Sequence, residues 1–326
     1  MKCSTWNSRF SGCCFVPRET FPSHPWPFSA FIDTWCVLPC DEFGMARLLP
    51  ALGKGGMGRI IAIANQKGGV GKTTTAVNLA AALGVAEKRT LLIDIDPQGN
   101  ATSGTGINKN EVPLSIYHVL IGEKTLAEVV QPTAIPSLSV APSNINLIGA
   151  ELELVNLPER ETRLREAIAP YIEAYDYIII DCPPSLGLLT VNALTAAGSV
   201  LIPLQCEYYA LEGLSELLNT IGLIRSSLNE RLALEGILLT MYTTRINISR
   251  QVEDEIREHF PNDICRTIIP RNVRISEAPS FGQPVILYDI RSKGAESYLL
   301  LAEEIIDHDQ KSAGTRAGGS HPAETP

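Results

Sequence analysis

The chain has 326 residues, with 27 lysines and arginines against 36 aspartates and glutamates, and a formal net charge of −9. This length allows one large α/β domain or two small ones. The acidic balance argues against a polybasic nucleic-acid binder, although it leaves room for a local basic patch. No apolar run approaches the roughly 18 residues of a membrane span. No signal-peptide core follows Met1. We therefore expect a cytoplasmic protein with reduced thiols.

The first 57 residues differ in composition from everything that follows. They contain all three tryptophans, a proline cluster and no sustained helical or strand period. Cys36 and Cys40 form one pair, but no second well-spaced pair completes a four-ligand zinc site. Met57 leads directly into the first apolar strand. Our hypothesis is that translation starts at Met57, and that residues 1–57 are upstream sequence or a disordered extension.

A glycine-rich loop connects an apolar strand at 59–65 to a helical run at 75–83. This context is the one that a phosphate-binding loop requires. Its glycines let successive N–H groups turn toward an anion, and the start of the helix adds further free N–H groups. Lys72 is expected to reach the β- and γ-phosphates, and the Thr73 hydroxyl is expected to bind Mg²⁺.

The loop departs from the ordinary pattern G-x-x-x-x-G-K-[ST] in one informative way. Counting back from Gly71, the first glycine should occupy position 66, where the chain has Gln66. A second lysine, Lys67, follows directly. A nucleotide already held by Lys72 rarely needs another cation in the same loop. We therefore interpret Lys67 as a charge directed at the phosphates of another subunit.

The remaining elements alternate regularly along the chain. We expect strands at 90–94, 138–141, 176–181, 199–205, 236–242, 267–269 and 285–287. We expect helices at 114–121, 126–130, 145–155, 161–174, 210–228, 248–260 and 295–306. The leucine-rich stripe of the helix at 210–228 is interpreted as core. The sum is a doubly wound, mostly parallel sheet in one domain over 58–307, followed by a disordered tail at 308–326.

Three aspartates end two of the predicted strands. Asp94 and Asp96 close the strand at 90–94, and Asp181 closes the strand at 176–181 in the Walker B form. Ligands of parallel α/β sheets bind at the carboxyl ends of the strands, so these side chains should meet beside the loop. We expect a nucleotide and Mg²⁺ there. Cys182 and Cys206 lie in or beside buried strands, and we interpret them as small hydrophobic residues.

Several of these segments together resemble the ParA/MinD family of deviant Walker A ATPases. The segments are 67–74, 94–102, 180–185 and 206–213. A further stretch at 269–274, followed by 276–280, resembles the ParA/Soj branch of that family. The likeness covers nearly all of 58–307 and excludes the first 57 residues and the tail.

The resemblance implies an ATP hydrolase that depends on Mg²⁺ and forms a nucleotide-sandwich homodimer. Lys67 would cross to the partner's phosphates, and Gly68 would allow two loops to approach closely. Asp96 would position the attacking water, with Asp94 beside the Mg²⁺ shell that Thr73 and Asp181 complete. The other nucleotide-binding positions implied are Gly69, Val70, Gly71, Lys72 and Thr74 in the loop, with Pro270 and Asn272 at the adenine.

The resemblance also implies a function in partition. The ATP dimer would bind DNA without sequence preference on the nucleoid, and a ParB-type centromere-binding partner would stimulate hydrolysis, moving chromosome origins or plasmids. The matching DNA-binding positions are Arg245 and Arg274, with Arg271 nearby. Sequence composition adds little support, because eight basic and seven acidic residues lie between Arg245 and Lys293.

Three other interpretations remain open at this point. A MinD-like membrane-cycling ATPase needs a basic C-terminal amphipathic helix, whereas the polar face of 299–309 is acidic and an anionic membrane would repel it. A nitrogenase-reductase-like iron–sulfur protein needs paired cluster cysteines, and Cys182 has no suitable mate. A P-loop metabolic enzyme such as a synthetase is possible, although no extra substrate motif supports it.

Overall fold

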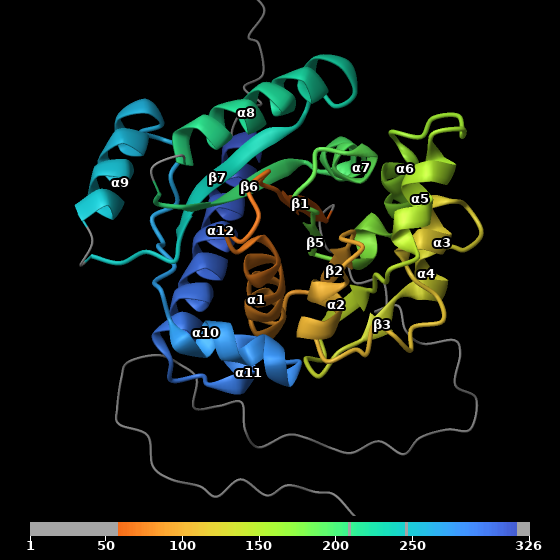
Figure 1. Cartoon of the computed structure of the whole chain (residues 1–326), viewed down its shortest axis with the longest axis horizontal. Helices are drawn as coiled ribbons and strands as arrows, with labels where there is room; N and C mark the ends of the chain where they lie inside the picture. Colours follow the sequence, from red (N-terminus) through yellow and green to blue (C-terminus); the bar gives the residue numbers. More distant parts are fainter. Residues whose placement is uncertain (1–57, 208–209, 245–246, 318–326) are drawn as a thin grey trace, which may run out of the picture. The chain divides into compact units, whose positions relative to one another are not determined.

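The computed structural model describes residues 58–207, 210–244 and 247–317 (Figure 1). These residues form a seven-stranded sheet in the order β3-β4-β2-β5-β1-β6-β7. Every adjacent pair is parallel except the antiparallel pair β3–β4. The strands are β1 Arg59–Ile63, β2 Thr90–Asp94, β3 Gln131–Pro132, β4 Leu138–Ala141, β5 Tyr177–Asp181, β6 Ser199–Gln205 and β7 Ala233–Thr240. The predicted mostly parallel, doubly wound α/β fold is confirmed.

Helices cover both faces of this sheet, as Figure 1 shows. The helices are α1 Lys72–Val85, α2 Asn100–Gly104, α3 Ile116–Leu120, α4 Leu126–Val129, α5 Leu147–Leu154, α6 Arg163–Ile168, α7 Leu188–Ala196, α8 Ala210–Ser227, α9 Asn247–His259, α10 Val273–Glu277, α11 Val285–Tyr288 and α12 Lys293–Ala317. Two short 3₁₀ helices, η2 Ala169–Ala174 and η3 Ala278–Phe281, extend α6 and α10.

The two faces of the sheet contribute to two separate hydrophobic cores. Within β1, Ile60 and Ala62 point to the core shared with α3, α5, α7 and α8, whereas Ile61 and Ile63 point to the core shared with α1 and α12. This division follows from the two-residue period of a strand. The central strands β2 and β5 are buried along their whole length, as expected of parallel strands covered on both faces. The leucine-rich stripe of α8, which the sequence predicted to be core, packs into the first of these two cores.

The register of the central strands brings the predicted site residues to one edge. Asp94 is paired with Asp181 across β2 and β5, and Ile63 is paired with Asp181 across β1 and β5. Three strands therefore end at the same level, immediately before the loop that enters α1. The carboxyl edge of the sheet is where the candidate site must lie.

Two predicted strands are wrong. Residues 285–287 belong to the helix α11 rather than to a strand, because Val285 follows Pro284 and donates its N–H to the Asn78 side chain of α1 across 2.7 Å. Residues 267–269 form no strand. Isolated bridges from Ile264 to Ile237 of β7 and from Pro270 to Tyr242 flank this segment. The Ile269 N–H also donates to the carbonyl of Leu239 in β7 across 2.9 Å. Sequence reasoning also missed α7, which is buried on nearly all sides and shows no amphipathic period.

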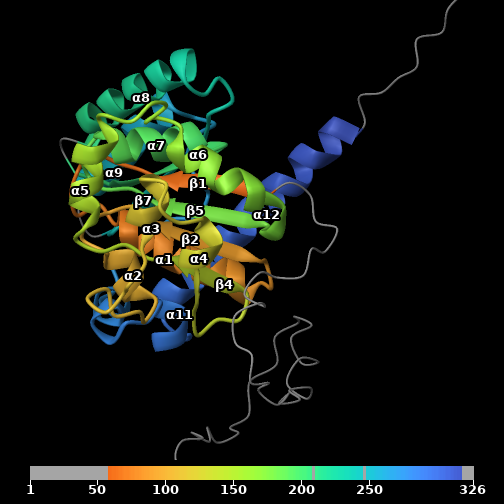
Figure 2. The same cartoon turned by 90° about the vertical axis from the view of Figure 1, so that its right-hand side faces the viewer.

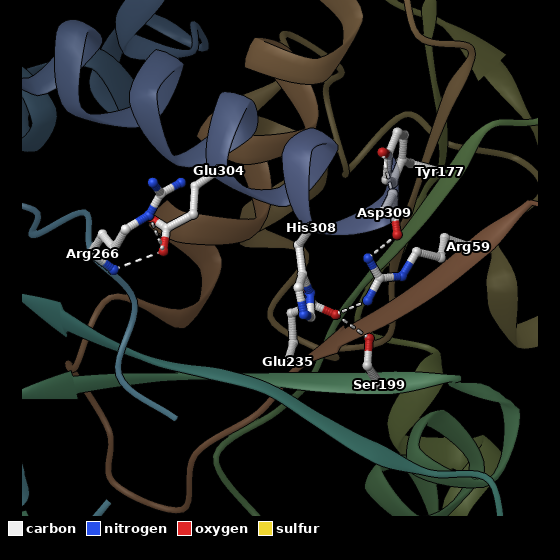
Figure 3. A network of polar contacts seen from close by, with 8 residues as sticks. All are labelled: Arg59, Tyr177, Ser199, Glu235, Arg266, Glu304, His308 and Asp309. Carbon is white, nitrogen blue, oxygen red and sulfur yellow. Dashed lines mark hydrogen bonds and ion pairs between the residues drawn. The ribbon is translucent and has the colours of Figure 1, made fainter. Parts of the chain in front are cut away.

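The helix α12 continues beyond the end predicted for it. We expected a helix to Ile306 and a tail from His308, but residues 308–317 are helical. Figure 3 shows the polar contacts that hold this part of α12 against the amino ends of the strands. Arg59 of β1 forms ion pairs with Asp309 and Glu235. The Tyr177 hydroxyl donates to Asp309 across 2.6 Å. The ordered domain therefore extends past the predicted boundary at 307.

No helix in the described part of the chain is both long and apolar enough to cross a membrane. Figure 2 shows the C-terminal end of α12 projecting on one side of the molecule, with α2 and α5 on the opposite side. Because α12 ends near the amino ends of the strands, α2 and α5 lie toward the carboxyl edge.

Candidate functional site

The loop between β1 and α1 is fastened to the neighbouring strands. The Asn65 side chain donates to the carbonyl of Pro203 in β6 across 2.7 Å and accepts from the N–H of Lys67 across 3.0 Å. The Thr240 hydroxyl at the end of β7 donates to the carbonyl of Val70 across 2.8 Å. These contacts fix the loop before any ligand binds.

Two of the loop glycines adopt the left-handed backbone conformation that favours glycine. Gly69 has φ 75° and Gly71 has φ 90°. Gly71 is the N-cap of α1 and supplies no side-chain cap. The first N–H groups of α1 therefore remain available to an anion. A Cβ added at Gly68 or Gly69 would meet no atom within 4 Å, so the loop borders open space.

The two lysines of the loop have different surroundings. The Lys72 amine is buried and donates to the carbonyl of Lys67 across 2.9 Å. Burial lowers the pKa of Lys72, and the nearby charge of Asp181 partly opposes this shift. The Lys67 amine forms an ion pair with Glu207 across 2.5 Å, at a partly exposed position.

Asp181 is a buried carboxyl group that lacks hydrogen-bond partners. Neither of its side-chain oxygens accepts a hydrogen bond from the described residues. Burial raises its pKa well above the usual value, and the neighbouring charge of Asp94 raises it further. The Thr73 hydroxyl is near enough to lower this pKa but is outside hydrogen-bond geometry. Buried carboxylates without protein donors need a cation nearby. Asp181 and Thr73 together therefore suit a magnesium ion.

Asp94 is equally buried, but its carboxylate is fully occupied. One oxygen accepts from both the N–H and the hydroxyl of Thr102, across 2.8 Å and 2.7 Å. The other oxygen accepts from the N–H of Asp96 across 3.1 Å. Burial raises the pKa of Asp94 to about 6 despite these donors. In this arrangement Asp94 anchors the loop that carries Asp96, and its predicted place beside Mg²⁺ remains a prediction.

Asp96 lies at the wall of the site, and hydrogen bonds with Gln98 and Ser143 hold it there. Its side chain accepts from the N–H of Gln98 across 2.9 Å. Its carbonyl accepts from the Ser143 hydroxyl across 2.7 Å, and the Ser143 N–H donates to Thr102 across 2.8 Å. One carboxylate oxygen of Asp96 therefore has no hydrogen-bond donor among the described residues and can accept a proton or a hydrogen bond.

A cavity of about 550 Å³ joins these elements to the C-terminal third of the chain. Ten of the predicted site residues line it: Gly68, Gly69, Gly71, Lys72, Thr73, Thr74, Asp96, Pro270, Arg271 and Asn272. The Asn272 side-chain oxygen caps α10 by accepting from the N–H of Arg274 across 2.9 Å. Its amide nitrogen has no hydrogen-bond acceptor within the described part of the chain and can donate to a ligand.

Sequence reasoning missed several residues that line this cavity. Met241 follows β7, and Tyr298 comes from α12, more than 200 residues after the loop. The Tyr298 hydroxyl lies 3.4 Å from that of Thr75, which brings α12 against the loop helix. No local pattern identifies such residues, because only the tertiary fold brings them to the site. Ile269 and Pro270, by contrast, belong to a segment that the sequence singled out.

The predicted DNA-binding arginines are in different places. Arg245 lies outside the described residues. Arg271 is exposed and also lines the rim of the cavity. Arg274, on α10, is exposed and forms ion pairs with Glu277 across 2.9 Å and with Asp289 across 3.2 Å. Arg271 and Arg274 are both exposed and lie three residues apart, and their contact with DNA stays a prediction.

The cysteines in the described part of the chain, Cys182, Cys206 and Cys265, are all buried and free. Burial raises the pKa of each thiol. Within the same residues no group of three or more histidine, cysteine or acidic side chains is placed to hold a metal ion. The interpretation of Cys182 and Cys206 as small hydrophobic residues agrees with this environment.

Comparison with known proteins gives a consistent result. Residues 58–234 match the family described as an AAA domain. The chain is 60% identical over 253 residues to the chromosome partitioning protein ParA of Myxococcus xanthus, covering 78% of this chain and 89% of that protein. It is 58% identical over 249 residues to the sporulation initiation inhibitor protein Soj of Bacillus subtilis, covering 76% and 98%.

A solved structure with the same fold also has a nucleotide bound. The cobyrinic acid a,c-diamide synthase of Mycobacterium smegmatis, with bound ATP analogue and magnesium, superposes with a TM-score of 0.70 at 37% sequence identity. The match covers 78% of this chain and 97% of that one.

Proposed function

The chain belongs to the ParA/Soj family of chromosome-partitioning ATPases, and on this premise we propose that it is a Mg²⁺-dependent ATP hydrolase that cycles on and off DNA. The observation that carries the proposal is the cavity in which Lys72, Asp96 and the free N–H groups of α1 converge. In the proposed cycle an ATP-bound homodimer binds DNA without sequence preference. A ParB-type partner then stimulates hydrolysis and releases the dimer.

The residues of the cavity suit ATP. Among the described residues, the buried Lys72 amine has only a neutral carbonyl as its hydrogen-bond acceptor, so it can turn to a phosphate that carries charge. The left-handed glycines and the start of α1 present N–H groups to the same anion. Pro270, and the free amide nitrogen of Asn272, are our candidates for contact with the adenine.

Asp181 and Thr73 would hold the magnesium ion. The Asp181 carboxylate is buried, accepts no hydrogen bond from the described residues and lies near the Thr73 hydroxyl. The ion supplies charge neutralisation at the phosphates when bound. Asp96 would orient the attacking water through the carboxylate oxygen that accepts no protein hydrogen bond. The contacts of Asp94 and Ser143 keep the Asp96 loop in place for that task.

Two features of the loop support a dimer. The Lys67 amine pairs with Glu207 at a partly exposed position, outside the group of residues that line the cavity of its own chain. Gly68 has no backbone need for glycine, since its φ is not in the left-handed region, and nothing in its own chain would touch a Cβ there. A requirement for glycine would come from a second molecule that approaches closely. This is the role that we propose for the loop of the partner subunit.

The experiment that tests the proposal measures retention of the full chain on non-specific duplex DNA. We expect retention with ATP but not with ADP, and a steep loss of retention when salt rises from roughly 50 to 200 mM. Equal retention with both nucleotides would contradict ATP control of DNA binding. A dimer that forms with ATP but is not retained on DNA would contradict DNA as the matrix and leave the ATPase assignment standing.

A further inference from the structure

The helix α5, together with the turns at its two ends, has large apolar side chains exposed on its outer face. Ile145, Ile148, Leu152 and Val155 expose 61%, 50%, 73% and 54% of their surface. They recur at intervals of three, four and three residues, which places them along one face of the helical stretch. We call these four residues the α5 stripe. The opposite face carries Leu147, Ala150 and Leu154, which are fully buried.

The α5 stripe is not needed for the core, because α5 already packs through its inner face. From Ile145 to Val155 the stripe spans ten steps of about 1.5 Å, or about 15 Å, which matches roughly three turns of a second helix. Isolated exposed apolar residues are common, but a row of four along a helix and its two end turns indicates an interaction surface. The remaining question is which kind of partner it suits.

The charges around the stripe answer that question. From Ile145 to Glu161 the chain has four glutamates and a single arginine, Arg160. Arg160 is engaged by Glu161 across 2.8 Å and by the carbonyl of Val155 across 2.7 Å. The rim of the stripe is therefore acidic. DNA and an anionic membrane would be repelled, and a second copy of this chain would bring an identical acidic rim against it.

The stripe lies next to the elements that hold the nucleotide site. Glu151, on the side of α5, is so close to Gly187 that an added Cβ would lie 2.6 Å from its carboxylate oxygen. Gly187 is the N-cap of α7, three residues after Pro184 in the cavity wall. On the other side, Ser143 precedes Ile145 by two residues and donates to the carbonyl of Asp96 across 2.7 Å. A partner on α5 would therefore act on both loops at once.

We propose that the α5 stripe docks a basic amphipathic helix of the protein that stimulates hydrolysis. Leucine-like side chains of the partner would pack on the stripe, and its lysines or arginines would meet Glu151 and Glu153 at the rim. The docked helix would bias the position of Ser143, and through it the Asp96 loop, and would bias the position of Gly187 at the start of α7. This inference rests on the proposed function for the identity of the partner, whereas the surface itself follows from exposure and charge.

The probe is a labelled synthetic peptide of about four helical turns, with leucines at helical spacing and lysines at all other positions. Its binding to the full chain is followed by fluorescence anisotropy at moderate salt with ATP. The test variant is Leu152→Ser, and the matched control is Leu223→Ser, a leucine 69% exposed on α8. We expect at least roughly tenfold weaker binding for Leu152→Ser and no change for Leu223→Ser. A peptide with glutamates in place of lysines should not bind.

Replacement of Leu152 by a photo-crosslinking amino acid then identifies what contacts the stripe. Crosslinking to the basic peptide supports the proposal. Crosslinking to a second copy, or to another part of the same chain, overturns it. Equal peptide binding by both serine variants, or no binding by the wild type, also overturns it. Because peptide binding requires no hydrolysis, a chain that binds the peptide on the stripe but never hydrolyses ATP would overturn the proposed function alone.

Discussion

The Lys72 amine donates a hydrogen bond to the carbonyl oxygen of Lys67 across 2.9 Å, so one cation of the loop is bound to the backbone of the other. The hydrogen-bond acceptor of this cation is therefore a neutral carbonyl, although the charge of Asp181 also acts on it. Burial already lowers the pKa of Lys72. A phosphate would replace the carbonyl with a charged acceptor, which is a stronger interaction in a buried setting.

The first prediction concerns this lysine. Lys72→Ala should weaken ATP binding by roughly 30-fold or more, because removing one partner of a buried charge pair costs about 2–5 kcal/mol. Isothermal titration with ATP and magnesium measures the effect. The control is Lys124→Ala, which removes a surface lysine paired with Glu128 and should leave affinity unchanged. Wild-type affinity in Lys72→Ala would show that the loop does not bind the phosphates.

The second prediction separates binding from turnover. Asp96→Ala should keep ATP affinity and ATP-dependent dimerisation while hydrolysis falls by a factor of about 100 or more, because the side chain is proposed to position water rather than nucleotide. Phosphate release and analytical ultracentrifugation on the same sample measure the two properties. Asp254→Ala removes an exposed carboxylate of α9 and serves as the control. If hydrolysis continues at the wild-type rate, another group positions the water.

The sequence predicted much of this site because parallel strands place their carboxyl ends at one edge. The aspartates of β2 and β5, and the loop after β1, were expected to meet, and the register from Asp94 to Asp181 brings them together. The residues of the phosphate-binding loop could also be predicted, because glycine spacing and the strand–loop–helix context are local properties of the sequence. The predicted bounds of β2, β4 and β6 agree with the structure for the same reason.

Features that depend on distant contacts could not be predicted in this way. Asp94 and Asp181 look alike in sequence, yet Thr102 satisfies the first and nothing among the described residues satisfies the second. The contribution of Tyr298 to the cavity depends on the packing of α12 against α1. The continuation of α12 beyond residue 307 depends on Arg59, near the other end of the domain.

The third prediction uses the pKa of Asp181, which burial raises above its usual value. In the unfolded chain this carboxyl ionises at its usual pKa, whereas in the ligand-free fold ionisation is opposed. The free energy of unfolding therefore falls as pH rises through the range above the usual pKa. Asp181→Asn should remove this dependence and stabilise the ligand-free protein at pH 7 by about 1–3 kcal/mol.

Urea unfolding without nucleotide or magnesium, from pH 7 down to about 4, measures this effect. The gain from Asp181→Asn should shrink as the pH falls, because the wild-type carboxyl becomes neutral as well. Asp254→Asn, an exposed matched change, should show no such trend. A destabilised Asp181→Asn protein at pH 7 would indicate that the ionised carboxylate has a favourable partner in the fold. The same variant should also lose the stabilisation that magnesium adds to the ATP-bound wild type.

The fourth prediction concerns the surface that we propose to contact DNA. Arg274 is exposed on α10, and its ion pairs with Glu277 and Asp289 are surface contacts that contribute little to stability. Arg274→Ala should therefore keep the fold and the ATP dimer, but lower DNA affinity and reduce the slope of log affinity against log salt by about one unit per lost phosphate contact. Fluorescence anisotropy on duplexes of unrelated sequence measures both quantities.

The matched control for Arg274 is Arg257→Ala on α9, since Arg257 is likewise exposed and paired with a neighbouring carboxylate, Glu253. It should bind DNA as the wild type does. Glu277→Gln gives a second test in the opposite direction, because it frees Arg274 from its competing carboxylate and should strengthen DNA binding. If Arg274→Ala and Arg257→Ala bind DNA equally well, the phosphates are contacted elsewhere. Arg245 would then be the next residue to substitute, since it is the other arginine that matches the DNA-binding positions of the family.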